Sequence, residues 1–180
     1  MNVMEKFILV LFTGWVLTMA GCKKESTFQT NVFYFTGFEG ESGPNFEGWS
    51  GVGYDFSNDT PPVSGFWSVE IAPQTAPAVG FIENDVRFNP GNYSLRLSCD
   101  AKREGNIGLG VLQLLKVDDG NNILEILGEV NITSDEWEAA EINAEVSIES
   151  GTKTMIRIVA GTTETALWKI LVDNVKLATL

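Results

Sequence analysis

The chain has 180 residues, no histidine, and 24 acidic against 12 basic side chains, which gives a formal net charge of −12. That charge argues against nucleic acid as a partner, because the phosphates would be repelled. The lack of histidine excludes Ser-His-Asp and Cys-His catalytic arrangements and HExxH zinc sites, so any enzyme built on this sequence would work with carboxylates.

The first segment is an apolar run from Phe7 to Met19, followed by Ala20, Gly21 and Cys22. A run of about 13 residues is too short to cross a bilayer, which takes about 20, but it has the length of a signal-peptide core. Small residues before a cysteine resemble the lipobox of bacterial lipoproteins, in which the cysteine is acylated and becomes the first mature residue. The alternatives are an uncleaved membrane anchor or a secretory signal with an incidental cysteine.

The lipobox resemblance implies a lipid anchor at Cys22, with acyl chains of the palmitate type, in the bacterial cell envelope at the outer membrane. We therefore expect a signal peptide over residues 1–21, a lipidated cysteine and tether over 22–30, and one domain over 31–180. About 158 mature residues are the size of a single domain. With Cys22 acylated, Cys99 lacks a disulfide partner and is expected to be an inert core residue.

Residues 36–65 are rich in Gly, Pro, Ser, Asn and Asp, which predicts a long loop region of the kind that often carries function. Beyond it, apolar and polar residues alternate with the two-residue period of half-buried strands in four segments: Trp67–Ile71, Tyr93–Cys99, Ala140–Val146 and Thr154–Ala160. Many short strands without intervening helices predict an all-β sandwich or jelly roll.

Three further segments complete the predicted strands. Ile107–Val117 and Ile123–Val130 flank the turn sequence Asp118–Asn122, which predicts a β-hairpin, and Trp168–Leu177 is expected to be a closing strand. Two segments compete as helices, namely Ile123–Val130 and the stretch that begins at Ser134, which has an N-cap serine and acidic residues in its first turn. Gly128 in the former, and alternation after Trp137 in the latter, favour strands.

Three motifs in order suggest a family. They are Thr36–Gly40 followed by Gly48-Trp49, then Asn89–Leu95, and finally Val172–Leu177. Together they resemble the galactose-binding-like jelly roll shared by carbohydrate-binding modules of the family 4, 9, 16 and 22 type. The resemblance covers nearly all of residues 31–180 and implies a glycan-binding β-sandwich.

In that family, a glutamate of the opening motif and an aspartate of the closing motif often hold a structural calcium ion. The resemblance places these roles on Glu39 and Asp173. Calcium takes six to eight oxygen ligands, which two carboxylates and turn carbonyls can supply. Alternatively, each carboxylate caps a turn or accepts backbone N–H bonds. Asp118 and Asp119 form another carboxylate pair, which the hairpin explains without a metal.

Sugar-binding proteins offer flat aromatic faces to pyranose rings, so aromatic residues outside predicted core positions are candidates for ligand binding. We assign this role to Trp49, Tyr54, Phe66 and Trp168. Trp67 and Trp137 are instead expected to pack in the core, because large aromatic side chains chiefly supply buried area.

The sequence thus favours a non-catalytic, lipid-anchored envelope protein that binds glycans. A structural or protein-interaction lipoprotein, with an envelope protein as partner and no sugar ligand, is the alternative. A carboxylate-only glycoside hydrolase ranks lower, because retaining glycosidases need two carboxyl groups about 5 Å apart. The pairs Glu83/Asp85 and Glu136/Glu138 are close only in sequence.

Overall fold

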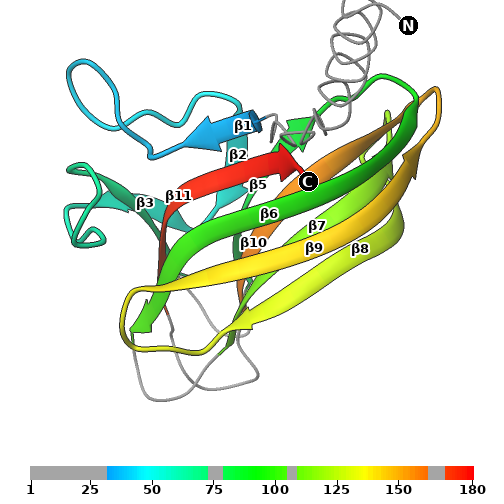
Figure 1. The fold of residues 1–180 in the computed structure, drawn as a ribbon. Coiled ribbons are helices and arrows are strands. Elements are labelled where there is room, and N and C mark those ends of the chain that lie inside the picture. The colour runs from blue at the N-terminus through cyan, green and yellow to red at the C-terminus, as the bar shows by residue number, and fades with distance from the viewer. Residues whose placement is uncertain (1–31, 73–78, 105–108, 162–168) are drawn as a thin grey trace, which may run out of the picture.

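The computed structural model describes residues 32–72, 79–104, 109–161 and 169–180, and these residues form two packed antiparallel sheets (Figure 1). The predicted signal peptide, the tether and Trp168 lie outside the described residues. Within the described residues, no helix has the length and apolar character needed to cross a membrane.

The first sheet has six strands, in the order β3 (Tyr54–Ser57), β4 (Ser68–Ile71), β11 (Lys169–Thr179), β6 (Gly91–Glu104) and β9 (Glu138–Ile148), with β1 (Val32–Thr36) paired to β11. The second sheet has five, in the order β2 (Trp49–Val52), β5 (Gly80–Val86), β10 (Thr152–Gly161), β7 (Leu109–Asp118) and β8 (Ile123–Ile132). Strands far apart in the chain are therefore neighbours, and the predicted all-β sandwich is confirmed.

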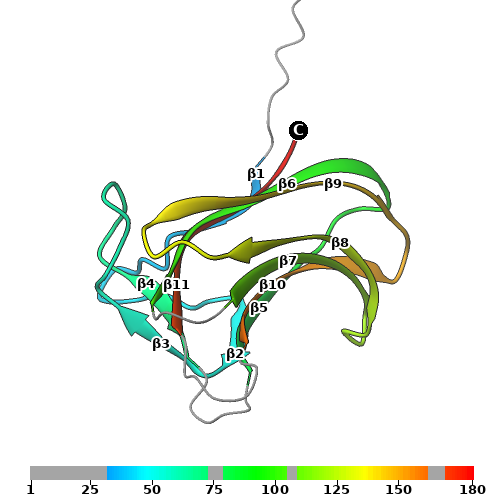
Figure 2. The ribbon, with the colours of Figure 1, turned by 90° about the horizontal axis from the view of Figure 1, so that it is seen from below.

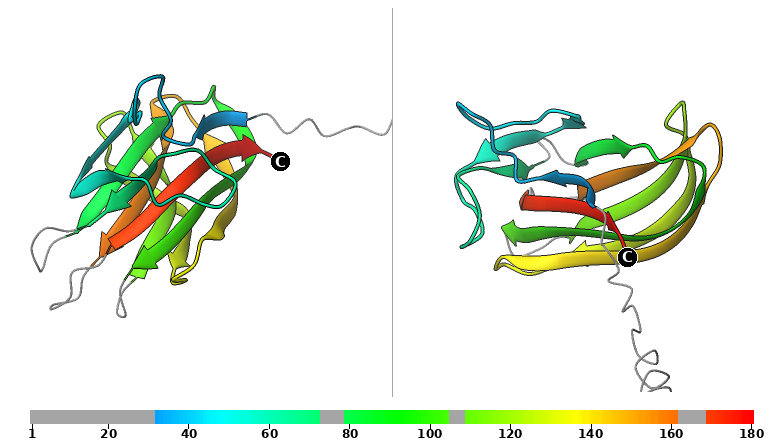
Figure 3. Two further views of the ribbon diagram at one scale, coloured as in Figure 1. Left: turned by 90° about the vertical axis from the view of Figure 1, so that its left-hand side faces the viewer. Right: turned by 45° about the horizontal axis from the view of Figure 1, so that its top comes forward.

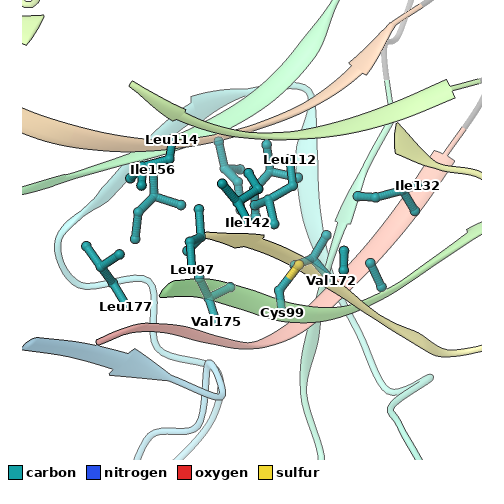
Figure 4. Close-up of a cluster of buried hydrophobic side chains, with 14 of the residues drawn as sticks. Leu97, Cys99, Leu112, Leu114, Ile132, Ile142, Ile156, Val172, Val175 and Leu177 are labelled. Atoms are coloured by element: carbon teal, nitrogen blue, oxygen red, sulfur yellow. The ribbon is translucent and has the colours of Figure 1, made fainter. Parts of the chain in front are cut away.

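The core lies between the sheets, where the alternating side chains of both point inward (Figure 4). Leu97, Cys99 and Ile142 of the first sheet face Leu114 and Ile156 of the second, and all five are almost fully buried. Full burial of one such aliphatic side chain contributes roughly 1.5–3 kcal/mol. Burial also raises the pKa of the Cys99 thiol, which agrees with the inert role expected for it.

The hairpin predicted around Asp118 is present, and its turn is held by that side chain. Oδ1 of Asp118 accepts bonds from the backbone N–H groups of Gly120 and Asn122, both at 2.8 Å. Asn121 lies in the left-handed region at φ 64°, which asparagine tolerates better than most residues. Both segments with a helix alternative are strands, β8 and β9.

One expectation was wrong, because residues 36–65 are not all loop: β2 and β3 lie within them. The one glycine within β2, Gly51, has a cause other than a loop. A Cβ on Gly51 would lie 2.3 Å from the carbonyl oxygen of Phe81 in β5. Glycine is required there by the close approach of two paired strands.

The second sheet is curved, and its concave side faces away from β6 and β9 (Figure 2). At one end of the first sheet, β1 pairs antiparallel with the last part of β11, which brings the first and last described strands side by side (Figure 3). The outer face of this sheet is partly covered by residues 58–67. There, Asp59 pairs with Lys102 and accepts a hydrogen bond from Nε1 of Trp137 at 3.2 Å.

Candidate ligand-binding face and metal site

The outer, concave surface of the second sheet carries side chains from four strands that the pairing aligns. Phe81 and Glu83 of β5 lie beside Val159 and Arg157 of β10, and Gln113 of β7 is on the other side of Arg157. We call this surface the concave face and define it by its described residues: Phe81, Glu83, Asp85, Val111, Gln113, Leu115, Val117, Glu129, Asn131, Lys153, Met155, Arg157 and Val159.

Arg157 is the central charged residue of the concave face. Its guanidinium carbon lies 4.7 Å from the centroid of the Phe81 ring, within the range of a cation–π contact. Its Nε lies 3.9 Å from Oε2 of Glu83, too far for a hydrogen bond. That Nε is buried and has no hydrogen-bond partner among the described residues. An unsatisfied buried donor costs about 1–3 kcal/mol, so a movement of Arg157 that brings this Nε to an oxygen acceptor would be favoured.

The neighbours of Arg157 divide the concave face into a polar and an apolar part. Nε2 of Gln113 donates to Oε2 of Glu129 at 3.2 Å, so both side chains keep further capacity for hydrogen bonding. Towards the β7–β8 hairpin, Leu115, Val117 and Met155 form a small apolar cluster. This cluster is buried, so the apolar contact on this face comes from the Phe81 ring. Together with the hydrogen-bonding groups beside it, that ring suits a ligand with apolar and hydroxylated sides.

The predicted ligand residues do not share this face. Trp49 is only 8% exposed. It packs on Phe38, with ring centroids 5.7 Å apart, and its Nε1 donates to Oη of Tyr34 at 2.6 Å. Its ring therefore offers no free side to a ligand in this structure.

The other three predicted ligand residues are also not on the concave face as the structure describes it. Tyr54 stacks on Phe46, with ring centroids 4.2 Å apart. Phe66 is 78% exposed but lies between β3 and β4, and Trp168 falls outside the described residues. Sequence reasoning missed Arg157 and Phe81. Alternation had placed Arg157 on the outward side of its strand, and that was the only signal available for it.

The two predicted metal ligands do come together. A Cβ placed on Gly37 would lie 3.6 Å from Oδ1 of Asp173, 3.4 Å from Oδ1 of Asn174 and 3.9 Å from Cγ of Glu39. Glu39 and Asn174 line the same hollow at this end of the first sheet, together with Ser64. Asp173 and Asn174 thus lie close to Gly37 and Glu39, although they are far away in the sequence.

Each carboxylate already has hydrogen bonds. Oε1 of Glu39 accepts from the backbone N–H groups of Phe66 and Trp67 at 2.7 and 2.8 Å. Asp173 is fully buried and accepts from the Ser64 hydroxyl and from the Asn174 backbone N–H. Both carboxylates therefore accept backbone N–H bonds, as the alternative to a metal role predicted for each of them.

The electrostatics at Asp173 favour a positive charge nearby. Burial, the main cause, raises the pKa of Asp173 to about 6, and the carboxylates of Glu39 and Asp100 act in the same direction. Asp100 is the direct cross-strand neighbour of Asp173, and like charges in that position destabilise a sheet. A cation between these groups would offset both effects.

Backbone strain accompanies both carboxylates. Phe38 precedes Glu39 and has a φ of 56°, and Asn174 follows Asp173 and has a φ of 50°. A bulky residue such as phenylalanine rarely adopts this region, and such strain collects at ligand-holding sites. Among the residues that the structure describes, no group of three or more Asp, Glu, Cys or His side chains is arranged for a metal ion. Asn174 and Ser64 would have to supply further oxygens.

No protein-family model and no curated protein matches the chain, but solved structures do. The CBM22-2 xylan-binding domain of Paenibacillus barcinonensis is 16% identical with a TM-score of 0.61, and the match covers 82% of this chain and 99% of that one. The CBM22-1 xylan-binding domain of the same organism is 15% identical with a TM-score of 0.58, over 83% and 95%.

A Stig cyclase from Fischerella sp. TAU is also similar, with 13% identity and a TM-score of 0.63, over 84% of this chain and 98% of that chain. Binding domains and an enzyme thus share this architecture, and the fold alone does not decide between the two activities. The likeness confirms the predicted jelly-roll, galactose-binding-like sandwich as the fold of this chain.

Proposed function

We propose that the chain is a non-catalytic module that binds a glycan on its concave face. The observation that carries this proposal is the buried, unpartnered Nε of Arg157 beside the ring of Phe81. The apolar ring suits the hydrophobic side of a sugar, and Arg157, Glu83 and Gln113 suit its hydroxyl groups. Xylan binding by two structural neighbours supports a glycan as the ligand class.

Among the described residues, the place of the carboxyl group with a raised pKa supports binding over catalysis. A carboxylate enzyme needs a reachable carboxyl group with a raised pKa. Among the described carboxyl groups, Asp173 has a strongly raised pKa, but it is fully buried and lies away from the concave face. We therefore infer that the concave face holds its ligand without cleaving it.

We propose further that Cys22 carries a lipid anchor that holds the module at the bacterial outer membrane. The support is the apolar run that ends in Ala20, Gly21 and Cys22. Three acyl chains on one cysteine would anchor the protein firmly, since two already suffice. Glycans or envelope proteins near the membrane surface would then be its partners.

We also propose a structural calcium ion at Glu39 and Asp173. The residues fit such an ion, because a buried carboxylate with a raised pKa, a second carboxylate and the oxygens of Asn174 and Ser64 converge there. When bound, the ion would neutralise the carboxylates and stabilise the strained turn at Phe38. This role is structural, because the site lies on the first sheet and the proposed glycan site on the second.

Binding to a glycan array, followed by titration of the best ligand, tests the proposed function. Arg157→Ala is expected to weaken binding about tenfold to hundredfold, the value of one or two hydrogen bonds to a charged group. Arg96→Ala is the matched control, because Arg96 also pairs with a glutamate, Glu141, but lies on the other sheet. If the two folded variants bind the glycan with equal affinity, the concave face is not the binding site.

A further inference from the structure

An uncharged aromatic surface lies where the described chain begins. Phe33 of β1 packs on Phe88, with ring centroids 4.6 Å apart, and Phe88 packs on Tyr93 at 5.0 Å. Phe33 is 44% exposed and the preceding Val32 is 49% exposed. We call these four side chains the aromatic patch. None of them is charged, although the whole chain carries a net charge of −12.

The aromatic patch is built as a fixed surface. Tyr93 donates its hydroxyl hydrogen bond to the carbonyl oxygen of Asn89 at 2.8 Å, and its ring and that of Phe88 pack on the edge of the core. Phe33 covers them from β1, which is itself paired to β11. Phe33 is therefore supported by the rings of Phe88 and Tyr93, and Val32 by the pairing of β1 with β11.

The chain before the patch limits what can cover it. Cys22 and Val32 are ten positions apart, so even a fully extended connection spans only about 35 Å. If Cys22 is acylated, the first described strand, β1, starts within that distance of the bilayer. Lys23 and Lys24 would lie at the headgroups, where each contributes attraction to an anionic leaflet.

We propose that the aromatic patch rests on the surface of the membrane that holds the lipid anchor. Aromatic side chains are enriched at the boundary between headgroups and acyl chains, and an apolar surface gains by leaving water there. The proposal rests on the proposed anchor at Cys22 but not on glycan binding. It orients the module, with the β1 end of the first sheet towards the bilayer.

The test uses the full chain, made in bacteria and purified with its anchor. Phe33→Cys is labelled with an environment-sensitive fluorophore and reconstituted in phosphatidylcholine vesicles, with or without bromine on the acyl chains. Cys99 is 2% exposed and does not compete for the label. Brominated lipid is expected to reduce the fluorescence at position 33 about twofold, because the probe lies within the depth that interfacial side chains reach. Val32→Cys serves as a second probe if Phe33→Cys fails to fold.

Phe66→Cys is the matched control, because Phe66 is also an exposed aromatic residue but its backbone is held by Glu39, beyond the other end of β1. Quenching at position 33 and not at 66 supports the proposal. Equal quenching at both positions, or none at either in protein that mass spectrometry shows to be acylated, overturns it. Absence of acylation overturns it as well. Glycan titration of the same samples measures separately whether the concave face binds a glycan.

Discussion

The carboxyl group of Asp173 has a pKa of about 6, above its ordinary value of 3.8, chiefly because it is buried. The folded state therefore binds the proton of this group more tightly than the unfolded state does. In calcium-free buffer this group makes folding less favourable as the pH rises from about 4 to about 6, because the folded protein must then hold a buried charge. The loss is at most about 3 kcal/mol.

Asp173→Asn is expected to remove this pH dependence and the response to calcium together. In the original protein, calcium should raise the melting temperature above about pH 6, where Asp173 is charged, and have little effect near pH 4, where the proton competes with the ion. Thermal unfolding followed by circular dichroism, with calcium or with a chelator, measures both effects.

The control for charge is Asp119→Asn, which removes an exposed carboxylate in the β7–β8 turn that pairs with Arg87. This variant should keep both the pH dependence and the calcium response. If calcium leaves the melting temperature of the original protein unchanged at pH 7 and pH 8, the proposed calcium site is contradicted. Glu39 would then serve only to accept the backbone N–H bonds.

At the scale of elements, the two sheets meet closely where β8 and β9 face each other. A Cβ placed on Gly128 of β8 would lie 2.4 Å from Cγ2 of Ile142 in β9. Gly128→Ala is therefore expected to lower the free energy of unfolding by about 1–3 kcal/mol, the usual cost of overpacking a core. Denaturant unfolding with urea measures the change.

Two variants make this measurement specific. Gly43→Ala is the control, because a Cβ there meets no atom within 4 Å, and it should leave the stability nearly unchanged. Combining Gly128→Ala with Ile142→Ala should cost less than the sum of the two single changes, because the second change creates the room that the first one needs. Strict additivity would show that the sheets do not press on each other at this point.

Strands could be predicted where the sequence pattern that specifies them lies within the strand itself or in an adjoining turn. The alternation within β6, β9 and β10 and the turn at Asp118 are local, and each predicted its strand correctly. β2 was not predicted, because its one glycine, Gly51, is required by the close approach of the partner strand at Phe81. The pair Glu39 and Asp173 was predicted only through a family resemblance, since no local pattern relates residues so far apart.

At the scale of the whole molecule, the concave face is a property of the assembled sheet. Phe81, Gln113, Glu129 and Arg157 lie on four different strands, and only the pairing of β5, β10, β7 and β8 aligns them. The sequence shows which side of each strand is outward but not how the sheet curves. The aromatic residues favoured from the sequence lie elsewhere, because Trp49 and Tyr54 pack around Phe46.

The same architecture separates the two surfaces that the proposals use. The aromatic patch includes Phe33 of β1, which belongs to the first sheet, and the concave face is the outer side of the second sheet. Contact of the aromatic patch with a bilayer would therefore leave the concave face free to bind a glycan. This arrangement requires that the chain is attached to the membrane at its N-terminal side, which makes Cys22 the residue to test.

Cys22→Ser is expected to abolish attachment of fatty acid to the protein and to release it from the membrane fraction. A serine cannot form the thioether to the lipid, and one weak apolar patch does not anchor a protein stably. Cells grown with an alkyne fatty acid report acylation, and fractionation reports location. Cys99→Ala is the matched control, because Cys99 is buried in the core and its loss should leave labelling and membrane location unchanged. Fatty acid on the Cys22→Ser protein would show that another residue carries the lipid, and the orientation proposed for the aromatic patch would fail with it.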